Sequence, residues 1–140
     1  MERVIALLRE KNHFLEKFFA VNENELINMA EGNFENVEEF YKVRDKILDL
    51  INCIEKLLEK EESEIKSSQV SAEQRVEIEA LMKIKDEWVT SILAQDLQVL
   101  SYIDREKSNI IKELKETQQF RRVVGAYAKQ DQINQLDEKI

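Results

Sequence analysis

The sequence lacks proline and contains only two glycines, one cysteine and one histidine among its 140 residues. Without proline, the strongest helix breaker is absent, so long helices are allowed. Gly32 and Gly125 cannot form a glycine-rich phosphate loop, and a single histidine, His13, cannot supply a histidine ligand pair or a triad within one chain. Cys53 has no partner for an intramolecular disulfide. These absences argue against an enzyme, and we predict neither a cofactor nor a bound metal.

The charge balance removes further classes of function. The formal net charge is -8, which argues against binding of nucleic acid or an anionic membrane surface, because both need a basic stripe. The first apolar run, Val4–Leu8, is too short for a signal-peptide core or a membrane span. We therefore expect a cytoplasmic protein with no direct membrane insertion. The chain length predicts one domain over residues 1–140.

Apolar residues recur at helical spacing along most of the chain, and 36% of the residues are charged. This pattern predicts an all-α protein, an antiparallel bundle of three long helices with a short C-terminal helix or frayed tail. The predicted segments are helices at about 2–31, 34–66 and 72–123, and a tail at 125–140. Gly32 suits the left-handed position after the first helix, and Asn33 is placed to cap the second. Ser71 and Gln74 form the pattern of a capping box before the third helix.

Each predicted helix has one apolar face, and together these faces should form the core. The first face contains Val4, Leu8, Leu15, Phe18, Phe19, Leu26 and Met29, interrupted by Lys11 and Asn22. The second contains Val37, Phe40, Ile47, Ile51, Ile54, Leu58 and Ile65, interrupted by Arg44 and Glu61. The third contains Ile78, Leu81, Trp88, Ile92, Val99, Ile103, Ile110 and Leu114. We expect Trp88 to anchor the core, Cys53 to be a small buried residue, and His13 to lie at the surface or at the edge of the seam.

The third helix is longer than the other two. At 1.5 Å per residue it would measure roughly 75 Å, against roughly 45–50 Å for each of the others, so its last turns should remain uncovered in a simple bundle. The apolar residues on these turns are Ile110, Ile111, Leu114, Phe120, Val123 and Val124. If exposed, they would mark a partner site. Alternatively, they pack on the first helix of the same chain, the helix breaks at Lys107–Asn109 and folds back, or a homodimer covers them.

The segment FLEKFFAVNENELINMAEGNFENVEEFYKVRDKILDLI carries a resemblance to a known family. It contains a long helix, a short turn with Gly32 and Asn33, and a second helix with Arg44 before the aliphatic pair Ile47 and Leu48. This arrangement resembles flagellar type III export chaperones of the FlgN type, in outline over nearly the whole chain. The resemblance implies a cytosolic, non-enzymatic chaperone. Its partners would be the helical terminal segments of flagellar hook–filament junction proteins and the membrane protein of the export gate.

The same resemblance suggests roles for the C-terminal residues. The client helix would bind to Ile110, Ile111, Leu114, Phe120, Arg121, Arg122, Val123 and Val124. The two arginines would pair with acidic partner residues. Gly125 would loosen the helix so that Tyr127 contacts the export gate. The related FliT type would instead hold the filament cap protein.

Two other readings of the chain remain open. A structural coiled-coil protein would pair its third helix with the third helix of a second copy. An enzyme subunit or carrier with a metal inside the bundle would need ligands from several helices.

Overall fold

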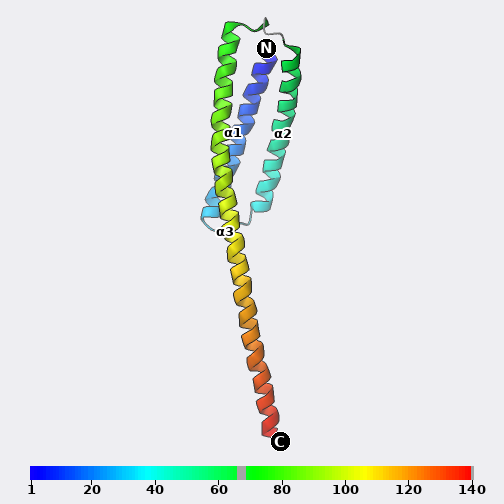
Figure 1. The fold of residues 1–140 in the computed structure, drawn as a ribbon, viewed down its shortest axis with the longest axis vertical. Coiled ribbons are helices and arrows are strands. Elements are labelled where there is room, and N and C mark those ends of the chain that lie inside the picture. The colour runs from blue at the N-terminus through cyan, green and yellow to red at the C-terminus, as the bar shows by residue number, and fades with distance from the viewer. Residues whose placement is uncertain (66–68, 140) are drawn as a thin grey trace. The chain divides into compact units, whose positions relative to one another are not determined.

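The computed structural model describes residues 1–65 and 69–139, and the side chains up to residue 127. The described part contains three α-helices, α1 (Glu2–Ala30), α2 (Val37–Glu64) and α3 (Ala72–Lys139), and no β-strand (Figure 1). The predicted all-α class is therefore confirmed. Lys66, the expected last residue of the second helix, lies outside the described residues, as do the side chains of most of the predicted tail.

The chain divides into two compact units, Met1–Leu100 and Ser101–Ile140. The first unit contains α1, α2 and the first part of α3, which lie side by side in Figure 1. The second unit consists of the remainder of α3.

The turn between α1 and α2 agrees with the sequence in one respect and differs in another. Gly32 has a φ of 78°, the left-handed conformation expected after a helix end, and its N–H donates to the Met29 carbonyl at 3.0 Å. Asn33 does not cap α2: its Oδ1 accepts from the Glu35 N–H at 3.0 Å and closes a short turn. The predicted start of the second helix at residue 34 is therefore wrong, and α2 begins at Val37.

The start of α3 confirms the predicted capping box. The Gln74 N–H donates to Ser71 Oγ, and the Ser71 N–H donates to Gln74 Oε1, both at 3.1 Å. Each residue thus satisfies a backbone donor that the first turn of a helix would leave unpaired. α3 begins directly afterwards, at Ala72.

The predicted end of the third helix is wrong. α3 continues through Gly125 to Lys139, so the expected stop at residue 123 with a separate tail does not form. A break at Lys107–Asn109 does not form either. The physical reason is that one glycine inside a helix costs only about 1 kcal/mol relative to alanine, and no proline or cap follows to end the hydrogen-bond pattern.

The core of the first unit is formed largely by the predicted apolar faces, to which the structure adds Ile5 and Leu7. One cluster of buried residues contains Val4, Leu7, Leu8, Ile54 and Leu58, and a second contains Leu15, Phe18, Ile47, Ile51 and Ile92. Val99 is 1% exposed. Trp88 is only half-buried and packs on Phe19, with ring centroids 5.3 Å apart. His13 is exposed, as expected.

The expectation for Cys53 is wrong, because its side chain is exposed. Successive residues of a helix point about 100° apart, so a residue that precedes a core position in sequence need not share its face. Ile54 occupies the core position, and Cys53 is turned towards solvent.

A polar network crosses the first unit where the sequence showed interruptions of the apolar faces. Asn22 is 0% exposed, and its Nδ2 donates to Gln95 Oε1 at 3.1 Å and Asp96 Oδ1 at 3.3 Å. Gln95 Nε2 in turn donates to the Phe19 carbonyl at 3.1 Å. Arg44 pairs with Asp96 at 3.2 Å. The network connects all three helices, and because its geometry is specific it fixes their register more sharply than apolar contacts do.

Candidate functional site

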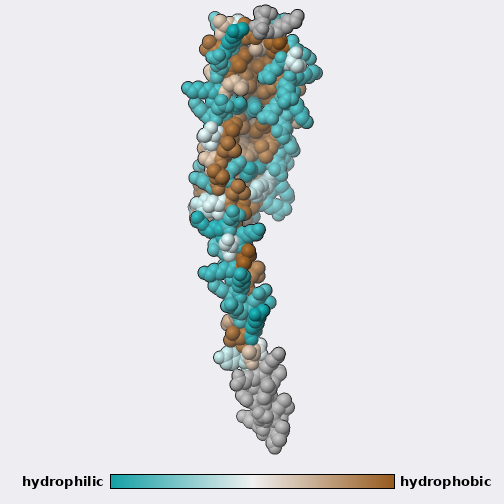
Figure 2. Space-filling view, viewed as in Figure 1, coloured by the Kyte–Doolittle hydropathy of each residue, from teal (hydrophilic) through white to brown (hydrophobic). Residues whose placement is uncertain are grey.

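The candidate site lies on the part of α3 in the second unit. All the apolar side chains predicted to bind a client are exposed there, from 45% for Ile111 to 69% for Phe120. Arg121 and Arg122 are exposed as well. Hydrophobic side chains that reach the surface among hydrophilic ones are visible on this part of α3 in Figure 2. In the described structure, these residues therefore present apolar surface that no other side chain covers.

The pitch of the helix sorts these residues into neighbouring stripes. At about 100° per residue, Ile110, Leu114 and Val124 fall within about 80° of one another, with Arg121 among them. Phe120, Val123 and Tyr127 form a second stripe beside the first, and Ile111 and Arg122 share the opposite margin. The set predicted from the sequence therefore forms a wide apolar surface around much of the helix, with a basic side chain inside it.

The two arginines of this surface have no ion-pair partner among the side chains described up to residue 127. Their cationic guanidinium groups offer donors in a planar fork that matches a carboxylate. The arrangement thus combines apolar contact area with positive charge. Such a surface is suited to an amphipathic helix that has acidic residues along one margin.

Tyr127 is 67% exposed on the same helix. The separate presentation of Tyr127 after a loosened Gly125 does not occur, because Gly125 lies inside α3. An added Cβ at Gly125 would meet no atom within 4 Å, so this glycine is not required by close packing in the described structure. Tyr127 is presented by the helix itself.

Sequence reasoning missed a second exposed apolar row, which lies in the first unit. Leu93, Leu97 and Leu100 on α3 are 60%, 71% and 56% exposed. Their spacing of four and three residues puts them on one face of the helix. The signal was present in ILAQDLQVL, but only the interleaved positions Ile92 and Val99 were assigned to an apolar face, and the three leucines were left out.

The described residues contain no group of three or more histidine, cysteine, aspartate or glutamate side chains placed to hold a metal ion. In the same part of the chain, no helix has a stretch long and apolar enough to cross a membrane.

Comparison with known proteins adds no relative: no protein-family model, no curated protein and no solved structure matches this chain.

Proposed function

We propose that this protein is a non-enzymatic export chaperone of the FlgN and FliT class. It binds the helical terminal segment of a flagellar hook–filament junction protein, or of the filament cap protein, in the cytoplasm and delivers it to the type III export gate. The observation that carries the proposal is the exposure of the apolar residues between Ile110 and Val124 on α3.

Exposed apolar area of this kind supports binding of a helix. Phe120 and Leu114 are 69% and 57% exposed, and transfer of such side chains from water to a protein interface is favourable by about 25 cal/mol per Å². A client helix that places its apolar face on this surface would be stabilised by the burial of this apolar area. Acidic residues at the margin of the client helix would pair with Arg121 and Arg122. In this proposal the client is an unassembled flagellar subunit whose terminal helix exposes an apolar face.

The first unit acts as the folded base of the chaperone in this proposal. Its three helical segments form an antiparallel bundle, as the short connection Glu31–Asn36 and the shared buried clusters support. The base keeps α3 ordered, so that the surface on its later turns is helical before the client arrives. A preformed helix lowers the entropic cost of binding.

Tyr127 is the contact to the export gate in this proposal. An exposed tyrosine supplies apolar area and a hydroxyl with little side-chain entropy to lose, which suits a transient contact. Its position near the client surface on one helix would couple client binding to delivery.

The exposed apolar residues of α3 also support a second candidate, a structural protein whose α3 pairs with the α3 of a second copy. The two candidates differ in what the surface binds. A chaperone of this class binds a client and needs no dimer, whereas a coiled-coil protein self-associates and binds no client.

A co-purification experiment tests the proposal. Tagged full-length protein is mixed with flagellar junction proteins and cap protein, alongside a truncated form that lacks residues from Lys115 onward. We expect the full chain to retain a client and the truncated chain to lose it, with the helical circular dichroism signal per residue preserved. Retention of no client by the full chain, or loss of a dimer on truncation, would reject the chaperone in favour of the structural protein.

A further inference from the structure

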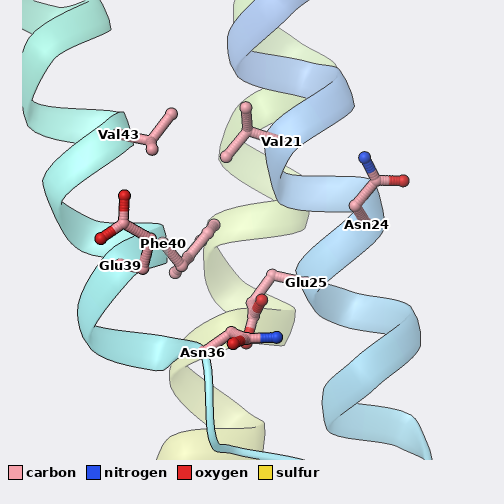
Figure 3. Close-up of a pocket in the computed structure, with 7 residues that line it drawn as sticks. All are labelled: Val21, Asn24, Glu25, Asn36, Glu39, Phe40 and Val43. Carbon is pink, nitrogen blue, oxygen red and sulfur yellow. The ribbon is translucent and has the colours of Figure 1, made fainter.

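A small pocket lies between α1 and the start of α2 in the first unit (Figure 3). Its volume is about 220 Å³. Pockets for drug-sized ligands and cofactors usually measure about 300–1,000 Å³, so this one fits a single side chain. The lining residues are Val21, Asn24 and Glu25 from α1 and Asn36, Glu39, Phe40 and Val43 from the start of α2.

The pocket contains a buried carboxylate with little compensation. Glu25 is 5% exposed, and among the described residues its Oε1 has no hydrogen-bond partner. Its Oε2 accepts from Asn28 Nδ2 at 3.4 Å, near the limit of a hydrogen bond. No ion pair includes Glu25 in the described part of the chain. A buried carboxylate without a partner is costly, and a cationic donor that reached this carboxylate would offset that cost.

The two cations next to this part of α2 in sequence have carboxylate partners other than Glu25. Lys42 pairs with Glu38 at 3.7 Å, and Arg44 pairs with Asp96 at 3.2 Å. The Arg44 guanidinium also lies over the Phe18 and Phe40 rings, 4.9 and 5.3 Å from their centroids, so Phe40 already packs against one guanidinium. A metal ion is also unsuited, because the described residues offer no group of three or more ligating side chains. The Glu25 carboxylate is therefore available to an organic cation from outside the chain.

The other lining groups favour a guanidinium over an ammonium. In Figure 3 the Glu25 side chain extends from α1 towards Asn36, and Phe40 lies between the two helices. Val21, Phe40 and Val43 provide apolar walls for a planar group, while Asn36 and Glu39 provide acceptor oxygens at the mouth. A guanidinium is more weakly hydrated than an ammonium and distributes five donors in one plane, so it suits a site with apolar walls and several acceptors.

We propose that the pocket formed by Glu25, Asn36, Glu39 and Phe40 binds the guanidinium group of an arginine side chain on a partner protein. The Glu25 Oε1 atom is itself buried, so binding requires the carboxylate to rotate about χ3 and present an oxygen to the pocket. This rotation is easy, because the χ3 angle of glutamate has a broad distribution. The inference goes beyond the proposed function, because it uses only residues of the first unit and holds or fails separately from the surface on the later part of α3.

The test is an NMR titration of the 15N-labelled full-length protein with Nα-acetyl-arginine amide. We expect saturable shifts of the backbone amides of Glu25, Asn36 and Phe40. The citrulline analogue, which has the same shape and no charge, should bind about tenfold more weakly or worse, and the lysine analogue should also bind more weakly.

Two variants complete the test. Glu25→Gln keeps the side-chain shape and removes the charge, and it should weaken binding by about tenfold or more. The control is Glu16→Gln, the same change at an exposed position of α1, which should leave binding unchanged. Equal binding of arginine and citrulline, equal binding of arginine and lysine, or unchanged binding to Glu25→Gln overturns the proposal. The same shifts on raising the protein concentration without the probe overturn it too, because a second copy would then fill the pocket.

Discussion

Replacement of Phe120 by alanine should separate binding from folding. Phe120 is 69% exposed in the free chain, so little of its apolar area contributes to the fold and most of it is available to a client. Full burial of a phenylalanine side chain stabilises by about 1.5–3 kcal/mol, and the exposed share of that term is roughly 1–2 kcal/mol. Phe120→Ala should therefore weaken binding of a client helix by about 5- to 30-fold.

The measurement is isothermal titration of the chain with a peptide of the terminal helix of a flagellar junction protein. Gln119→Ala is the matched control, because Gln119 is also exposed and adjacent but lies outside the apolar stripes. Gln119→Ala should leave the dissociation constant unchanged. Urea unfolding should give free energies of unfolding for both variants within about 0.5 kcal/mol of the parent chain.

Two results would refute this reasoning. Loss of more than about 1 kcal/mol of stability in Phe120→Ala would mean that Phe120 packs within the fold. The apolar area that we assigned to client binding would then already contribute to folding. Unchanged affinity with unchanged stability would mean that the client, if it binds, uses another surface. The exposed row of Leu93, Leu97 and Leu100 would then be the next surface to vary.

Three further predictions concern the fold. Asn22→Ala removes the donor to the buried Gln95 side chain and should lower the free energy of unfolding, measured in urea, by about 1–3 kcal/mol. The control Asn24→Ala, at an exposed position of the same helix, should have little effect. Equal effects of the two substitutions would contradict the role of the polar network. Ser71→Ala should cost about 1 kcal/mol in the same assay, because the Gln74 N–H loses its acceptor, and no loss would mean that the cap is not formed in solution. Cys53 should react with a thiol reagent in the folded protein at a rate close to that of the unfolded chain, and strong protection would contradict its exposure.

The helices and their caps could be predicted from the sequence because they depend on local interactions. Periodicity identified most of the core positions on α1 and α2, such as Leu8 and Ile51, and the spacing of Ser71 and Gln74 identified the start of α3. Gly32 marked the turn, since few other residues adopt a positive φ easily. The end of α3 was predicted wrongly because a single glycine only weakens a helix, and its effect depends on what surrounds it.

Partnerships between distant residues had no signature in the sequence. Asn22 and Arg44 looked like interruptions of two apolar faces, and only the packed helices bring them to Asp96. The buried carboxylate of Glu25 was likewise one acidic residue among 29, and the pocket around it exists only where α1 meets α2.

The sequence by itself determined that this chain is helical and acidic, with apolar residues near the end of a long third helix, because these properties follow from composition and from spacing along the chain. The tertiary structure decided which polar side chains became buried and which apolar ones stayed exposed. Burial of a given side chain depends on contacts between helices. Such contacts depend on the direction and register in which the helices pack, and no local sequence pattern specifies these.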